Sequence, residues 1–285
     1  MSGDLFGPLA AGDDLLAATS GAAWVQAMLD AEAALALASA DVGVVTTGVA
    51  DEIAAACATL EVDPAELGRA GRGGGNPVIP LVAVLRGSLA EPGASWVHWG
   101  ATSQDILDTA AALVASRAGH MVGAHLDRLA DGCADLAERH RDTLTVARTL
   151  LQPALPTTFG AKAAGWLVGT LQARRQVAEA TARLPASLGG AGGTLAAFGH
   201  DGPAVAARFA TRLDLPAALV PWHTARQPVA ALGSALAVTT ATAAKVTGDV
   251  ALLMQAEVAE ASEPPGRGGS STLPQKRNPI AATLV

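Results

Sequence analysis

Apolar residues recur at every third or fourth position through much of the chain, which is the spacing of one face of an α-helix. The spacing is clear over residues 21–40 and continues without a proline from residue 102 to about residue 140. Two further long helices are expected over residues 156–184 and 228–259. No strand-like alternation and no internal repeat stand out. The pattern therefore predicts an all-α protein built around an elongated bundle of long helices.

Residues that commonly begin helices predict shorter elements before the long ones. Thr47 is expected to cap one helix, and Pro64 begins a short one. Pro77 follows a glycine-rich loop and suits the first position of the next helix. We expect these elements to form an N-terminal helical domain over residues 1–100, followed by the central bundle domain over residues 101–285.

The composition agrees with this fold class. Half of the 285 residues are hydrophobic, 16% are charged, and the chain has no tyrosine and only four phenylalanines. Disordered chains carry more charge and fewer apolar residues, and β-rich proteins use more aromatic residues. Alanine is the commonest residue, and alanine favours long helices that pack closely.

Charge and cysteine content restrict the setting and the partners. The net charge of −7, without a basic tract, argues against nucleic acid as a partner. Cys57 and Cys133 are expected to be reduced core residues, which fits a cytoplasmic protein without a signal peptide. Residues 227–244 carry no charge, yet they contain several hydroxyl side chains, so a buried bundle helix is expected here and no membrane contact. His120 and His125 are spaced poorly for a shared metal ion, and no metal is expected.

The segment with the most side chains suited to catalysis or ligand binding is residues 268–279, GGSSTLPQKRNP. Small residues make a loop that can close over a ligand, and Lys276, Arg277 and Asn278 offer cations and an amide to an anion. Backbone N–H groups and Lys276 would stabilise a serine alkoxide, which would make Ser270 or Ser271 a proton acceptor. On composition alone, a solvated basic turn is the favoured interpretation of the segment.

The same segment resembles the signature loop of the fumarase/aspartase superfamily, which is commonly written GSSxMPxKxNP. Leu273 stands where that family usually has methionine, a mild apolar exchange. Nearly a dozen consecutive positions take part in the resemblance, so it is far more specific than a short motif.

Residues 97–110, VHWGATSQDILDTA, resemble the first conserved region of that superfamily. Thr102 and Ser103 would offer hydroxyl and N–H donors to a substrate carboxylate at the start of a long helix. His98 would donate a proton or a hydrogen bond. Asp105 and Asp108 are expected to cap the helix and to hold neighbouring segments.

Residues 148–160, RTLLQPALPTTFG, resemble the second conserved region, where many members read Arg-Thr-His. Leu150 replaces that histidine, and a leucine cannot transfer a proton. Arg148 and Gln152 are retained. The segment is similar to the 3-carboxy-cis,cis-muconate cycloisomerase branch, as are residues 73–82, 159–166 and 189–199, so the resemblance covers essentially all of the chain from Gly21 onward.

The resemblance implies an all-α homotetramer without a cofactor, whose active sites combine the conserved regions of three subunits. It implies reversible lactonisation of 3-carboxy-cis,cis-muconate to 4-carboxymuconolactone in protocatechuate breakdown. Ser270 would be the base, with Ser271 the less favoured choice, and Lys276 and His98 would assist. A small tricarboxylate would be bound by the remaining site residues, namely Asn76, Thr102, Ser103, Arg148, Gln152, Arg277 and Asn278.

Two alternatives remain open from the sequence. One is another lyase of the superfamily, such as an adenylosuccinate lyase, which would need an acid that position 150 does not supply. The other is a non-catalytic helical protein. Residues 278–280 look like the start of a further helix, so we expect the chain to be a truncated form that lacks the last central helices and the C-terminal domain.

Overall fold

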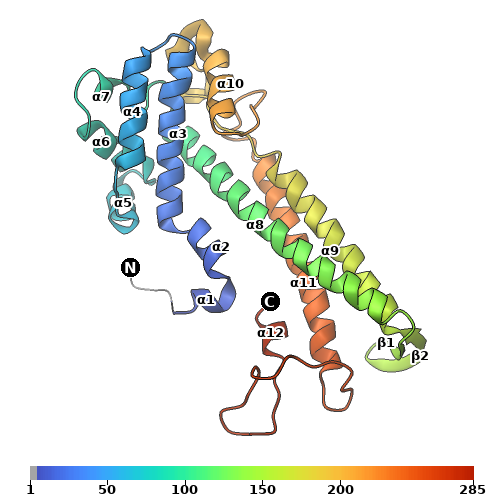
Figure 1. Ribbon diagram of the computed structural model, residues 1–285. Helices are drawn as coiled ribbons and strands as arrows, with labels where there is room; N and C mark the ends of the chain where they lie inside the picture. The colour runs from blue at the N-terminus through green and yellow to red at the C-terminus, as the bar shows by residue number, and fades with distance from the viewer. Residues whose placement is uncertain (1–4) are drawn as a thin grey trace. The chain divides into compact units, whose positions relative to one another are not determined.

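The computed structural model describes residues 5–285, and most of these residues are helical (Figure 1). Contacts within the chain divide it into two compact units. Unit 1 contains residues 5–12, 120–179 and 232–285, and unit 2 contains residues 13–119 and 180–231. The predicted all-α fold class is confirmed. The predicted boundary at residue 100 separates two consecutive stretches of sequence, whereas each of these units combines distant stretches. The boundary stays a prediction.

Unit 2 is built on three helices, α3 (Gly21–Asp41), α4 (Thr47–Thr59) and α10 (Gly202–Arg212). Helices α4 and α10 both pack against α3. The predicted helix over residues 21–40 is thus confirmed. The largest fully buried apolar side chains of this unit are Met28, Leu29, Leu35, Ile53, Val78, Leu81, Leu85, Val97, Ile106 and Phe209.

Shorter elements complete unit 2. They are α2 (Asp13–Ala18), α5 (Pro64–Ala70), η1 (Gly71–Gly73), α6 (Val78–Gly87), α7 (Gly93–Trp96), η2 (Ala191–Gly193) and η3 (Ala196–Asp201). Pro64 begins α5 as predicted, and Asp63 caps that helix by accepting hydrogen bonds from two backbone N–H groups. The predicted cap at Thr47 is wrong by one residue, because Thr46 has the extended backbone of a capping residue and Thr47 is already helical. Pro77 likewise precedes α6 instead of occupying its first position.

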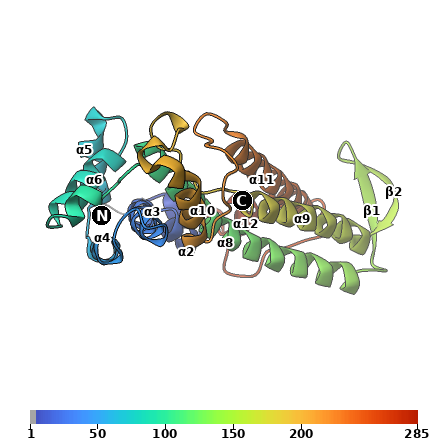
Figure 2. The same ribbon diagram turned by 90° about the horizontal axis from the view of Figure 1, so that it is seen from above.

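Three long helices contribute to unit 1: α8 (Ser103–Arg139), α9 (Phe159–Thr181) and α11 (Gln227–Leu253). Within unit 1 they run alongside one another (Figure 1, Figure 2). Their packing is carried by one buried cluster, made of Cys133 from α8, Ala163 and Trp166 from α9, and Val246 and Leu253 from α11. The predicted bundle of long helices is confirmed in this unit.

A β-hairpin joins α8 to α9, and the sequence did not predict it. Strand β1 (Leu144–Thr149) pairs antiparallel with β2 (Gln152–Thr158), with Leu144 opposite Thr158 and Thr149 opposite Gln152. The expected start of a helix at residue 156 is therefore wrong. The residues of β2 are mostly exposed and the four inner residues of β1 are all half-buried, so no apolar face alternates along either strand and the usual sequence pattern of a strand is missing.

Helix α11 differs from its prediction in length and in burial. It ends at Leu253, six residues before the expected end, and the chain leaves most of its surface exposed. By length and composition it meets the requirement for a membrane-spanning helix, and 11% of its most apolar window is buried. The prediction of a buried bundle helix is wrong for the single chain, because its partners in unit 1 cover one face only. A sequence pattern marks an apolar surface without saying which chain covers it.

The ends of the chain add two short helices, α1 (Gly7–Ala10) and α12 (Ile280–Thr283). The expected helix start at residues 278–280 is thus present as a single turn. Both cysteines are free and buried, as predicted. Burial, together with the nearby carboxylates of Glu32 and Asp30, raises the pKa of the Cys57 thiol to about 12.

Candidate active site

In unit 2, two predicted site residues far apart in sequence are in contact. The Asn76 amide donates a hydrogen bond to the Ser103 hydroxyl over 3.3 Å. The side-chain oxygen Oδ1 of Asn76 accepts a hydrogen bond from the backbone N–H of Val78 over 3.0 Å, so this side chain also caps the start of α6. Both side chains are partly exposed, and Ser103 begins the 37-residue helix α8. A helix N-terminus with polar side chains around it favours an anionic ligand.

His98 lies in the connection between α7 and α8, and its backbone is left-handed, with φ at 60°. Its ring nitrogen Nδ1 lies 2.6 Å from Oε1 of Glu32. The Glu32 side chain is fully buried, whereas 15% of the His98 side chain is exposed. Glu32 was not predicted to be part of the site. A charged residue in the apolar stripe of residues 21–40 was the available signal.

Asp105 organises the loop of glycines around the start of α8. Its buried carboxylate accepts hydrogen bonds from the backbone N–H groups of Thr102 at 2.9 Å, Gly189 at 2.8 Å and Gly190 at 2.9 Å. Its Oδ1 also lies 2.5 Å from Nε2 of His223. The expectation that Asp105 caps the helix and holds a neighbouring segment is confirmed. The glycine pair is thereby fixed beside Thr102.

Asp108, one turn further along α8, has a similar holding role. The Arg226 guanidinium donates to both of its carboxylate oxygens, over 2.6 and 2.9 Å. Gln104 adds a third hydrogen bond of 2.8 Å. Neither His223 nor Arg226 was predicted to take part, because each lies 118 residues from its partner and belongs to no recognisable motif.

In unit 1, the signature loop closes on itself. The backbone N–H of Asn278 donates to the Gly268 carbonyl over 2.8 Å, and Gly269 forms a bridge with Arg277. Gly268 has φ at 70°, and a Cβ there would lie 2.1 Å from the Asn278 carbonyl oxygen, so a side chain cannot be accommodated. The loop needs a glycine at this position for both reasons.

The Ser270 hydroxyl faces backbone donors within this loop. Its Oγ accepts hydrogen bonds from the N–H groups of Thr272 over 3.2 Å and Leu273 over 3.0 Å. These donors would stabilise negative charge on Oγ. Ser270 is partly exposed, whereas Ser271, Lys276 and Arg277 are exposed.

A cavity of about 250 Å³ lies at the base of the loop. Arg267, Arg277 and Asn278 are among its lining residues, and arginine side chains favour an anion. Glu263 also lines it and accepts hydrogen bonds from the backbone N–H groups of Ala281 over 2.8 Å and Ala282 over 3.3 Å.

Arg148 and Gln152 lie on the hairpin. The Arg148 guanidinium donates to both carboxylate oxygens of Glu260, and this pairing holds the pKa of Glu260 below its ordinary value. Gln152 is exposed beside the two-residue turn formed by Leu150 and Leu151. The leucine that replaces the usual histidine thus stands at the tip of the hairpin.

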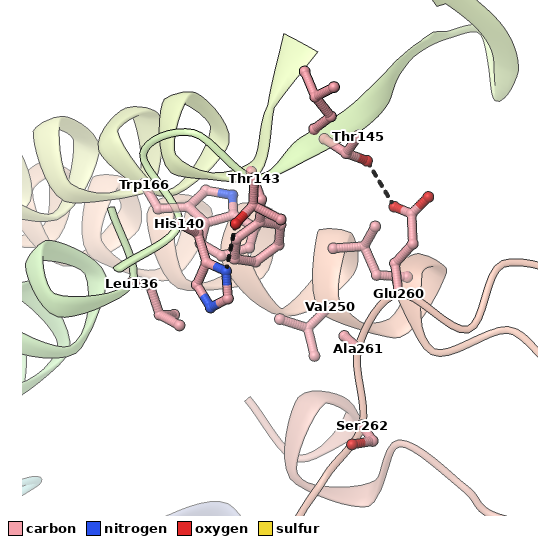
Figure 3. A pocket seen from close by; sticks show the side chains of 12 residues that line it. Leu136, His140, Thr143, Thr145, Trp166, Val250, Glu260, Ala261 and Ser262 are labelled. Carbon is pink, nitrogen blue, oxygen red and sulfur yellow. Dashed lines mark hydrogen bonds between the residues drawn. The ribbon is translucent and has the colours of Figure 1, made fainter. Parts of the chain in front are cut away.

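A second cavity in unit 1, of about 440 Å³, contains none of the predicted site residues (Figure 3). Leu136, Trp166 and Val250 contribute apolar walls, and Figure 3 shows Thr145 directed toward Glu260, to which it donates over 3.1 Å. His140 lies at one side, with Nδ1 3.2 Å from the Thr143 hydroxyl.

The predicted site residues are divided between the two units. Unit 2 holds Asn76, His98, Thr102 and Ser103, and unit 1 holds Arg148, Gln152, Ser270, Ser271, Lys276, Arg277 and Asn278. That they act in one site stays a prediction. Among residues 5–285, no group of three or more histidine, cysteine or acidic side chains is placed to hold a metal ion.

Comparison with known proteins gives consistent matches. The model of a lyase family matches residues 10–285. The 3-carboxy-cis,cis-muconate cycloisomerase of Bradyrhizobium diazoefficiens is 45% identical over 98% of this chain and 63% of its own length. A nitrosuccinate lyase of Streptomyces davaonensis is 44% identical over 99% of this chain and 62% of its own length.

A solved structure agrees with these matches. The crystal structure of the 3-carboxy-cis,cis-muconate lactonizing enzyme from Pseudomonas putida superimposes with a TM-score of 0.93 at 38% identity, covering 99% of this chain and 64% of that one. The chain therefore spans less than two thirds of the length of the relatives it matches.

Proposed function

Because the chain belongs to the lyase family of the fumarase/aspartase superfamily, we propose that it interconverts 3-carboxy-cis,cis-muconate and 4-carboxymuconolactone. The observation that carries the proposal is the closed signature loop, in which two backbone N–H groups donate to the Ser270 hydroxyl and in which Arg277 and Asn278 line a cavity together with Arg267. The similarity to cycloisomerases over almost the whole chain supports this choice of substrate within the family.

In the lactone-opening direction, Ser270 removes a proton from the carbon next to a carboxylate. The carbon–oxygen bond of the lactone then breaks, a carbon–carbon double bond forms, and the lactone oxygen leaves as part of a carboxylate. Lys276, Arg277 and Asn278 stabilise the negative charge that develops on the substrate carboxylate. Lactonisation follows the same steps in reverse, and Ser270 returns the proton.

The leaving group explains why Leu150 is tolerated. A carboxylate is a weak base and departs without a proton, whereas an amine needs a general acid. A Leu150→His variant should therefore leave cycloisomerase turnover within about tenfold of the wild type, since no proton is needed at this point. A rise by several orders of magnitude would show that an acid is required.

Further proposals concern assembly and location. We propose that the chain forms a homotetramer in the cytoplasm and that each active site draws on three subunits. The exposed apolar surface of α11 supports self-association, because such a surface is normally covered by a partner. Two buried free thiols suit a reducing compartment. Sedimentation velocity tests the assembly, and a monomer at micromolar concentration would contradict it.

The test of the activity is a spectrophotometric assay of the purified chain with 3-carboxy-cis,cis-muconate, performed on the wild type, Ser270→Ala and Ser271→Ala. Loss of a general base should lower kcat by about 100-fold or more in Ser270→Ala. Ser271→Ala should lose less, because the backbone donors face Ser270. Circular dichroism spectra of the three proteins serve as the control that each variant is folded like the wild type. Equal turnover in Ser270→Ala and the wild type would contradict the proposed base.

A second candidate function is a carbon–nitrogen lyase, and the 44% identity to a nitrosuccinate lyase favours it. Elimination from nitrosuccinate would release nitrite, which also departs as a stable anion and needs no acid at position 150. An adenylosuccinate lyase would release an amine and is less compatible with Leu150. Assaying nitrite from nitrosuccinate, and fumarate from adenylosuccinate, separates these activities from the cycloisomerase.

A further inference from the structure

Glu32 stands at a position where a charge is costly. It lies on the buried side of α3, where its neighbours are apolar, and its side chain has no exposed surface. Taking a carboxylate out of water is unfavourable unless its oxygens are paired. Only Oε1 has a hydrogen-bond partner among the described residues, and the buried Oε2 has none.

The partner of Glu32 is held in an unusual conformation. His98 adopts a left-handed backbone, which is strained for a residue with a side chain. It brings Nδ1 to 2.6 Å from Oε1 of Glu32, across 66 residues of sequence. The other ring nitrogen, Nε2, has no hydrogen-bond partner among residues 5–285, and part of the ring is exposed.

Stability does not explain this arrangement. A methionine at position 32 would fill similar space in the apolar stripe and would leave no unpaired carboxylate oxygen. Buried, imperfectly paired ionic groups concentrate at functional sites, where they fix the orientation of a neighbouring group. The Asp-His pairs of serine hydrolases use the same relationship, since a buried carboxylate sets the tautomer and the orientation of the ring.

We propose that Glu32 is a positioning residue for the carboxylate substrate. It accepts the Nδ1 proton of His98 and fixes the ring, so that Nε2–H donates a hydrogen bond to a substrate carboxylate. The His98 ring then lies between two carboxylates, one from the protein and one from the substrate. The role of the substrate carboxylate rests on the proposed function.

The test compares Glu32→Met, Glu32→Gln and His98→Gln with the wild type, using the full chain. Glu32→Met removes the acceptor, so KM should rise about tenfold while kcat stays within about twofold, as expected when binding equally present in ground and transition states is lost. Glu32→Gln keeps an uncharged acceptor and should fall between Glu32→Met and the wild type. A merely structural role would lower the folded fraction, which reduces apparent kcat and leaves KM unchanged.

Asp30→Asn is the matched control. Asp30 lies on the same helix and pairs with Arg117 over 2.8 Å, away from His98. Its loss should change neither KM nor kcat. Thermal unfolding of Glu32→Met should occur at or above the wild-type temperature, because the unpaired carboxylate is gone.

Direct binding of tricarballylate, an unreactive tricarboxylate, supplies a readout that does not need turnover. Isothermal titration should show about tenfold weaker binding in Glu32→Met, and the Glu32→Met/His98→Gln double variant should bind no more weakly than His98→Gln alone. Unchanged KM and Kd in Glu32→Met, or additive effects in the double variant, would overturn the inference while the proposed function stands. A wild type that neither binds nor turns over a tricarboxylate would overturn the proposed function, and the inference with it.

Discussion

Arg148 and Glu260 form a two-point ion pair that ties strand β1 to the segment after α11. Nη2 donates to Oε1 over 2.7 Å and Nη1 donates to Oε2 over 3.0 Å. About a quarter of each side chain is exposed, with values of 27% and 29%. The guanidinium that we expect to bind substrate is therefore already held in a fixed direction by a protein carboxylate.

The first prediction concerns the pH dependence of this pair. Hydrogen bonding to Arg148 holds the pKa of Glu260 below its ordinary value, so the stabilisation is present above the unfolded carboxyl pKa of about 4.3 and is lost as pH falls through the lower folded value. Glu260→Gln should unfold about 1–2 °C below the wild type at pH 7, and the difference should shrink as pH falls below about 4.3 and vanish once Glu260 is protonated in the folded state as well. Thermal unfolding monitored by circular dichroism at several pH values measures it.

The control for this prediction is Asp135→Asn, which removes a pair with Arg139 in which both side chains are more than half exposed. It should change the unfolding temperature by less than about 1 °C both at pH 7 and at acidic pH. A difference between Glu260→Gln and the wild type that grows as pH falls would contradict the sign of the effect.

The elements that the sequence predicted best are those whose structure is determined by neighbouring residues. Helix α8 was predicted within one residue at each end because an unbroken apolar spacing marks it. The hairpin was missed because burial does not alternate along either strand, so the strands carry no alternating apolar pattern. The signature loop was predicted as a site because its contiguous residues resemble a known family, and its role stays a prediction.

The contacts that hold the candidate site were beyond the sequence. Glu32 reads as an ordinary helical glutamate until His98, 66 positions later, is found beside it. Likewise Asp105 and His223 meet across 118 positions. A single sequence shows which side chains can take part in catalysis or binding, but the pairing of distant residues depends on how the helices pack.

A second prediction tests the hydrogen bond between two long helices of unit 1. The Trp166 indole N–H donates to Asp249 over 2.8 Å, and Asp249 also pairs with Lys245. Trp166→Phe keeps most of the apolar ring and removes the donor. It should lower the free energy of unfolding by about 1–2 kcal/mol, as expected for a hydrogen bond to a charged group plus the lost ring area.

Urea unfolding monitored by circular dichroism measures this difference. Trp99→Phe is the comparison, since the Trp99 side chain is 42% exposed. It should cost less than about 0.5 kcal/mol. Equal losses in the two variants would mean that the hydrogen bond to Asp249 adds nothing to stability.

A third prediction concerns Asp105, whose carboxylate accepts from three backbone N–H groups and lies against His223. Asp105→Asn turns one acceptor oxygen into an NH₂ group that faces these donors. The free energy of unfolding should fall by about 2–4 kcal/mol, because buried donors lose their acceptor.

Asp63→Asn provides the matched exchange at an exposed carboxylate. Asp63 caps α5 by accepting from the backbone N–H groups of Ala65 and Glu66. Asparagine caps helices about as well as aspartate, so this variant should lose less than about 0.5 kcal/mol. If Asp105→Asn lost no more than this control, the three backbone contacts would not depend on the charge.

The last prediction concerns the tip of the hairpin, where Leu150 and Leu151 have φ angles of 50° and 64°. A two-residue turn with positive φ at both positions favours Asn-Gly, and leucine is strained in it. Leu150 is 96% exposed and Leu151 is 66% exposed, so neither side chain gains much from burial in the single chain. The Leu150→Asn/Leu151→Gly double variant should therefore raise the free energy of unfolding by about 1 kcal/mol, measured in urea under conditions in which the chain is monomeric.

Under self-associating conditions the two leucines should instead be needed, because strained and exposed apolar residues are retained where a partner covers them. The double variant should then be the more stable monomer and the weaker enzyme, and equal or greater turnover than the wild type would show that the tip has no part in the assembled site.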